Sequence, residues 1–136
     1  MNKQKTLKTE IGCSGIALHS GKQTVLTLKP AEENSGIRVN RIDLLNGARE
    51  IAVSWRNVVD TQLATTVGND HGATIGTIEH LMAALAGCEI DNVLIEVDGP
   101  EIPIMDGSAA PFVFLIECAG IAEQNAPRSA IKILKP

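Results

Sequence analysis

The chain has 136 residues, of which 44% are hydrophobic and 21% are charged, as expected for one globular domain. Its net charge of −4 argues against a protein that binds nucleic acid or anionic membranes, because both functions need a basic surface. No hydrophobic run approaches membrane-spanning length, and the polar first residues lead into no signal peptide. The sequence therefore predicts a cytoplasmic domain without a transmembrane segment. Aromatic residues make up only 2%, so the core is expected to be aliphatic.

Three cysteines, Cys13, Cys88 and Cys118, are an odd number and have no C-x-x-C spacing. This usage favours buried thiols in a reducing cytosol over a disulfide framework or a zinc knot.

The first half of the chain is dominated by strand patterns. Alternating apolar residues between turn signals predict strands at residues 4–11, 23–30, 36–41, 51–54 and 63–68. The clearest is 23–30, with Leu26 and Leu28 on the inner face. Gly12 and Gly15 are expected to break the first strand.

The loops between these strands carry two of the three histidines. The segment 15–21, between glycines, presents His19, and the turn signal at 69–72 places His71 on a solvated loop tip. A further loop is predicted through Asn46 and Gly47.

Residues 75–88 predict a helix, which Thr74 or Thr77 can cap and Gly87 can end. Its apolar stripe consists of Ile78, Leu81, Met82 and Leu85. The opposite face carries small residues around one histidine, namely His80, Ala83, Ala84 and Gly87. A face of such small side chains lets another backbone or a ligand come close, so we expect it to be covered.

Glu79 and His80 form a carboxylate–imidazole pair on this helix. Most Glu-His pairs are only polar helix edges, so the pair alone does not establish a site. The metalloprotease pattern H-E-x-x-H is absent, because Ala84 follows His80 by one turn and Gly76 precedes it by one turn. If His80 binds a metal, its other ligands must come from elsewhere.

The second half predicts a buried strand at 92–97, an ordered loop at 99–108 and a second helix at 109–119. Ser108 is the expected N-cap and Gly120 the stop signal. The core stripe of this helix is Phe112, Leu115, Ile116 and Ala119. Residues 123–129 are polar, and residues 130–134 form a short strand-like run.

This order of elements predicts an α+β fold, with one mixed or antiparallel β-sheet and two helices packed on one face.

Four segments together resemble the UDP-3-O-acyl-N-acetylglucosamine deacetylases, the zinc amide hydrolases of lipid A synthesis. They are Gly-Ile-Ala-Leu-His-Ser-Gly at 15–21, Thr-Ile-Glu-His-Leu-Met-Ala-Ala-Leu-Ala-Gly at 77–87, Ile-Asp-Asn-Val-Leu-Ile-Glu-Val at 90–97, and Pro-Glu-Ile-Pro-Ile-Met-Asp-Gly-Ser-Ala-Ala-Pro-Phe-Val at 100–113. The last segment is long and specific, and the resemblance covers nearly the whole chain in the family's order.

The resemblance implies that residues 1–126 are the N-terminal one of two similar α+β domains, and that 127–136 begin the link to a second, C-terminal domain. It implies that His80 is a zinc ligand and that Glu79 is the general base for attack on the substrate acetamide. Zinc lowers the pKa of bound water towards about 7, and a neighbouring carboxylate can then take the proton.

The resemblance also implies a substrate-binding role for three loop residues. His19 lies near the substrate in the family, although as a residue type it could equally stabilise its own loop. Leu63 and Ala64 correspond to a loop that lines the family's active site. Asp106, in the most specific segment, is interpreted as a brace at the start of the second helix.

The family's remaining zinc ligands, in a His-Lys-x-x-x-Asp pattern, have no counterpart here, and neither do its acid histidine and oxyanion threonine. We therefore expect the 136-residue chain alone to be inactive. The alternative is a stand-alone, non-catalytic module that binds a sugar nucleotide or a partner protein, and a nucleic-acid role is disfavoured by charge.

Overall fold

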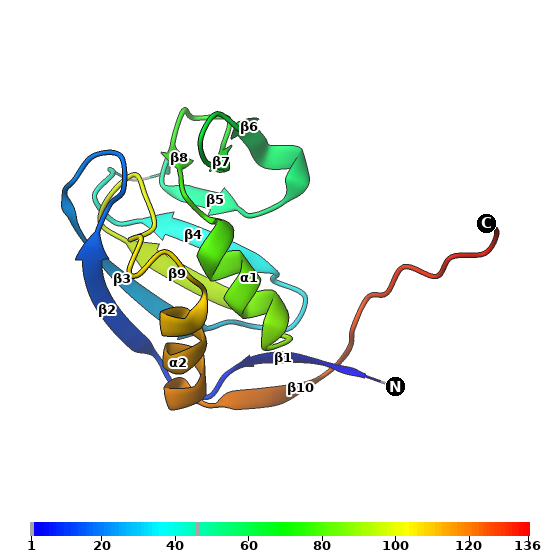
Figure 1. Cartoon of the computed structure of the whole chain (residues 1–136). Coiled ribbons are helices and arrows are strands. Elements are labelled where there is room, and N and C mark those ends of the chain that lie inside the picture. The colour runs from blue at the N-terminus through cyan, green and yellow to red at the C-terminus, as the bar shows by residue number, and fades with distance from the viewer. Residues whose placement is uncertain (1, 46) are drawn as a thin grey trace.

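The computed structural model describes residues 2–45 and 47–136, so the turn predicted at Asn46 lies partly outside the described residues. Within this part, the centre is a five-stranded sheet in the order β2-β3-β9-β4-β5 (Figure 1). Its strands are β2 (Ile11–Ile16), β3 (Gln23–Pro30), β9 (Val93–Val97), β4 (Ile37–Arg41) and β5 (Glu50–Ala52). Neighbours are antiparallel except β4 and β9, which run parallel.

Two smaller sheets flank the central one. At one end, β1 (Lys3–Leu7) pairs with β10 (Ile121–Pro127). At the other, β6 (Val58–Asp60), β7 (Thr66–Gly68) and β8 (Thr74–Ile75) form a three-stranded sheet, preceded by the 3₁₀ turn η1 (Trp55–Asn57). The predicted α+β class is confirmed, but the prediction of a single sheet is wrong, because these short strands pair with one another instead of extending the central sheet.

Helices α1 (Glu79–Gly87) and α2 (Ala110–Ala119) pack against each other on one face of the central sheet (Figure 1). The predicted inner face of β3 is confirmed, since Leu26 and Leu28 are fully buried. The helices contribute Leu81, Leu85, Phe112 and Ile116, which are also fully buried. Truncation of one such side chain to alanine typically costs about 2–5 kcal/mol, so this layer holds the helices on the sheet.

The expectation that Gly12 and Gly15 break the first strand is wrong, because both lie within β2. A Cβ atom on Gly15 would lie 2.9 Å from Met105 Sδ and 2.9 Å from Pro103 Cβ. The loop before α2 therefore passes so close to β2 that glycine is needed there. The Ile104 amide donates to the Ile16 carbonyl at 2.9 Å and fixes this contact.

Helix α1 begins at Glu79, later than predicted, and neither Thr74 nor Thr77 caps it with a side chain. Thr74 belongs to β8, and Thr77 has a positive φ of 57°, so the chain turns before the helix begins.

The predicted small-residue face of α1 is also wrong at one position. Ala84 is only 1% exposed and belongs to the core cluster. The exposed small residues are instead Ala83, Ala86 and Gly87. Their surface, with His80, is called the small-residue face below.

The C-terminal segment differs from the predictions in two places. The polar segment predicted at 123–129 is largely strand β10, and the strand-like run at 130–134 forms no strand. Polar side chains suit β10, because most of them are exposed and the backbone makes the pairing with β1. Residues 129–136 are exposed, and they extend away from the domain (Figure 1).

The three cysteines are free thiols, as predicted. They are not all buried, however. Cys118 is exposed on the outer side of α2, and Cys13 and Cys88 are half-buried.

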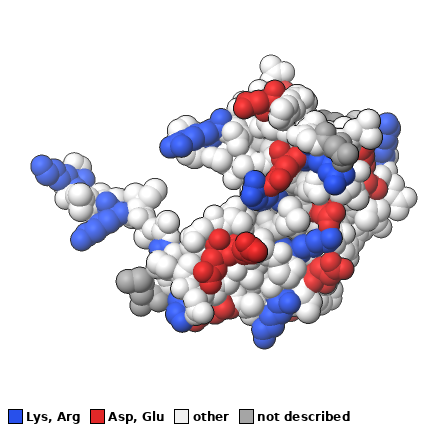
Figure 2. Space-filling model, turned by 180° about the vertical axis from the view of Figure 1, so that it is seen from behind, with Lys and Arg blue, Asp and Glu red and all other residues white. Residues whose placement is uncertain are grey.

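The face of the central sheet that points away from the helices carries both signs of charge close together (Figure 2). Ion pairs there join Lys29 to Glu96 and Arg38 to Glu50, between neighbouring strands. This pattern is typical of a solvated sheet face. In the described residues, neither helix has the length and apolar character needed to cross a bilayer.

Candidate functional site

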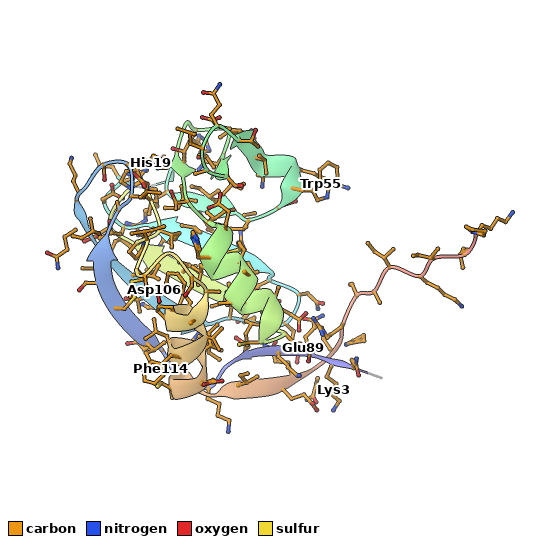
Figure 3. All side chains as sticks on the ribbon, in the orientation of Figure 1. Lys3, His19, Trp55, Glu89, Asp106 and Phe114 are labelled. Carbon is orange, nitrogen blue, oxygen red and sulfur yellow. The ribbon has the colours of Figure 1, made fainter. Side chains whose placement is uncertain are left out.

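An open pocket of about 320 Å³ lies where the β2–β3 loop, the three-stranded sheet and the segment before α1 meet. Its lining includes three residues that the sequence singled out, His19, Leu63 and Ala64. Thr77 and Glu101 line it as well. Figure 3 shows His19 on the β2–β3 loop and Asp106 just ahead of α2, at the end of the domain where α1 begins.

Glu79, the first residue of α1, lies beside this pocket although it does not line it. Its Oε1 accepts a hydrogen bond from the backbone amide of Thr65, which lies between the lining residues Ala64 and Thr66. Burial raises the pKa of the Glu79 carboxyl, but the hydrogen bonds from Thr65 and the nearby charge of His80 outweigh it and lower the pKa below its usual value. The Glu79 carboxyl is therefore ionised at neutral pH.

His80, the next residue, is half-exposed and follows Glu79 at the start of α1. Its charge also contributes to a lowered pKa of Asp106, after the stronger effect of the hydrogen bonds from Ser108. The imidazole of His80 thus lies in the field of two carboxylates, Glu79 and Asp106.

Asp106 acts locally as the predicted brace. Its Oδ1 accepts from the Ser108 amide at 2.9 Å and from the Ser108 hydroxyl at 2.7 Å. The Ser108 oxygen in turn accepts from the amide of Ala110 at 3.2 Å, at the first turn of α2. Ala109 is the N-cap by position, so α2 begins one residue later than predicted, and Ser108 supports its start from just outside the N-cap.

Glu101 is a residue of the candidate site that the sequence did not reveal. Its carboxylate is buried and accepts from the amides of His19 and Ser20, at 3.1 and 3.0 Å. His19 Nδ1 lies 3.2 Å from the same carboxylate, and the Thr77 hydroxyl lies 3.3 Å away. The only local signal was its place between Pro100 and Pro103, which fix the loop.

Three residues in the segments around the pocket have strained backbone conformations. Leu63, Thr77 and Met105 have positive φ angles of 61, 57 and 55°, which non-glycine residues rarely adopt. Such conformations cost on the order of 1–3 kcal/mol each and gather at functional sites. Leu63 is also 94% exposed, so its apolar side chain is available to a ligand or a partner surface.

The hydrogen bonds to Glu101 predict acid sensitivity of the fold. Burial raises the pKa of this carboxyl. The hydrogen bonds from the amides of His19 and Ser20 and from the His19 ring lower the pKa by more, so that it lies below its usual value. A lowered folded-state pKa stabilises the protein fully above the unfolded value of about 4.3, and this stabilisation is lost as the pH falls through the folded pKa. Urea unfolding between pH 7 and pH 3 should therefore show decreasing stability. The decrease should be smaller for Glu101→Gln, and an unchanged pH slope would contradict the assignment.

The described residues contain no group of three or more His, Cys, Asp and Glu side chains placed to hold a metal ion. His80 is a suitable zinc ligand by type, but a catalytic zinc site normally takes three protein ligands. These residues therefore do not form a complete zinc site by themselves.

Fold and site together define an α+β domain with a helix-borne carboxylate–imidazole pair next to an open, partly strained pocket. The chain matches the model of the LpxC family, UDP-3-O-acyl N-acetylglycosamine deacetylase, over residues 4–136, and it belongs to that family.

Curated relatives agree with this assignment. The chain is 56% identical over 136 residues to the UDP-3-O-acyl-N-acetylglucosamine deacetylase of Acidithiobacillus ferrooxidans, covering all of this chain and 44% of that protein. It is 56% identical over 137 residues to the protein of the same name from Legionella pneumophila strain Corby, again covering 44% of it. The chain thus spans less than half the length of the relatives it matches.

Proposed function

We propose that this chain forms the N-terminal domain of a zinc-dependent deacetylase that hydrolyses the acetamide of UDP-3-O-acyl-N-acetylglucosamine in lipid A biosynthesis. The supporting observation is the pair Glu79–His80, held at the start of α1 beside a pocket lined by His19, Leu63 and Ala64. Residues 1–126 would be the domain itself, and 127–136 the start of the link to a C-terminal domain.

In this proposal His80 supplies one zinc ligand, and the C-terminal domain supplies the others. The zinc ion would act as a Lewis acid towards the amide carbonyl and acidify water. Glu79 takes the proton from the attacking water. Its lowered pKa keeps it ionised, and further burial under a second domain would raise the pKa towards the operating pH, where a general base works best.

The C-terminal domain would cover the small-residue face of α1 and an apolar groove beside it. This groove, of about 490 Å³, is lined by Trp55, Val58, Met82, Ala86 and Arg128 among others. Trp55 is 80% exposed, which is unusual for a large aromatic side chain that has no partner surface. Arg128 lies where the chain leaves β10, so the link to a following domain would begin next to the groove.

We further propose a cytoplasmic location, supported by the three free thiols, which suit a reducing compartment.

The test compares this chain with a joined protein, in which it is followed by the C-terminal portion of the A. ferrooxidans relative. With UDP-3-O-acyl-N-acetylglucosamine and added zinc, the joined protein should release acetate and the 136-residue chain should not, because residues 2–45 and 47–136 contain no cluster of three ligands for zinc. Turnover by the chain alone that His80→Ala abolishes would contradict the proposal. A folded but inactive joined protein would favour the non-catalytic binding module.

A further inference from the structure

Glu101 connects three separate segments around the pocket. Its backbone is part of a parallel bridge with Gly76, in which the Gly76 amide donates to the Pro100 carbonyl at 2.8 Å and the Ile102 amide donates to the Gly76 carbonyl at 3.1 Å. Its side chain then reaches the β2–β3 loop at His19 and Ser20. The position of His19 is therefore tied, through one carboxylate, to the segment that leads into α1.

The chemistry of this contact determines which ring nitrogen of His19 carries the proton. An ionised carboxylate only accepts hydrogen bonds, and Glu101 already accepts from two backbone amides and faces the Thr77 hydroxyl. The His19 Nδ1 at 3.2 Å must therefore be the donor. In the neutral ring this leaves Nε2 as an acceptor, and no partner for Nε2 is found among residues 2–45 and 47–136.

We propose that Glu101 is a positioning residue that holds His19 with its proton on Nδ1, so that Nε2 accepts a hydrogen bond from a substrate hydroxyl. The part that concerns substrate rests on the proposed function. A hydroxyl fits this pocket better than a phosphate, because the carboxylates of Asp60 and Glu101 in the lining would repel an anion. The lining also contains the polar side chains of Gln62 and Thr66. Hydroxyl, amide and carboxylate side chains are the donors and acceptors that a sugar can satisfy.

The test measures the tautomer of His19 directly in the 136-residue chain. Nitrogen-15 labelled histidine and two-bond proton–nitrogen correlation spectra, recorded where the ring is neutral, distinguish a proton on Nδ1 from one on Nε2. His19→Asn identifies the signals, and the exposed His71 serves as the internal reference. We expect His19 to be protonated on Nδ1 in the unmodified chain. A proton on Nε2 would overturn the proposal without any variant having to fold.

Two glutamine variants separate positioning from general stability. Glu101→Gln should shift His19 towards the signal pattern of His71, because an amide can donate as well as accept. Glu96→Gln removes another partly buried carboxylate, paired with Lys29 away from the pocket, and should leave His19 unchanged. An unchanged tautomer in a folded Glu101→Gln variant would overturn the proposal.

In the joined protein, Glu101→Gln should raise KM about tenfold or more with a smaller change in kcat, because a substrate contact is weakened while Glu79 and His80 remain. A tenfold or greater loss in kcat with no change in KM would contradict a role in substrate positioning. If the joined protein has no deacetylase activity, the proposed function fails, whereas the tautomer measurement still decides the role of Glu101.

Discussion

Replacing Glu79 by glutamine in the joined protein is expected to lower kcat by about 10²–10⁴-fold while zinc stays bound. The side-chain oxygen of glutamine can still accept the hydrogen bond from the Thr65 amide, so the loop that lines the pocket should keep its position. The variant loses the negative charge and, with it, the ability to take a proton. Steady-state rates and metal content by mass spectrometry, measured on the same preparation, test this expectation.

The control for this experiment is Glu117→Gln, on the exposed side of α2. It removes the same charge without touching the pocket and should leave both kcat and zinc content unchanged. Zinc loss in Glu79→Gln would identify Glu79 as a ligand rather than a base, and full activity would exclude it from the chemistry.

Ala84→Lys is expected to destabilise the 136-residue chain by about 2–5 kcal/mol, the range of a serious core substitution. Ala84 is 1% exposed within the core cluster, so a lysine there must displace packed side chains and bury an ammonium group. Urea unfolding, followed by circular dichroism, measures the change. A cost below about 0.5 kcal/mol would mean that this side of α1 is free of contacts.

Ala83→Lys is the matched control, because it places the same side chain on the exposed side of the same helix. In the isolated chain it should change stability by no more than about 0.5 kcal/mol. In the joined protein the same variant should reduce both activity and zinc content, because the small-residue face is proposed to pack against the second domain. Unchanged zinc content in that protein would place the second domain elsewhere.

The elements that periodicity predicted well are those whose apolar spacing reports a buried face. The stripe of α2 around Phe112 and Ile116 and the inner face of β3 are examples. Strands β6, β7 and β8 were missed or misplaced because each is only two or three residues long, too short for a period to show. Ala84 was misplaced for another reason. An alanine suits a helix face that packs inside its own domain as well as one that another domain or a ligand covers. The spacing of residues therefore could not decide which environment Ala84 has.

The candidate site also combines features that the local sequence predicts with contacts that only the fold brings about. Glu79 and His80 are adjacent in sequence, so their pairing on one helix start followed from the local pattern. The contact between His19 and Glu101 joins residues 82 positions apart, and only the crossing of three loops brings them together. The role of Thr65 is carried by a backbone amide, which no side-chain motif can reveal.

The pairing of β1 with β10 sets the order of events during synthesis. Lys3 is matched with Pro127 and Leu7 with Ile121, so β1 has no partner strand until nearly the whole domain has left the ribosome. Contacts of such long sequence separation slow folding, because the loop-closure entropy must be overcome before they form. Leu7, which is 1% exposed in the finished domain, is left uncovered during that interval. The nascent chain therefore carries an unpaired strand with one apolar side chain, Leu7, for most of its translation, and folding of this domain is expected to be completed late rather than progressively.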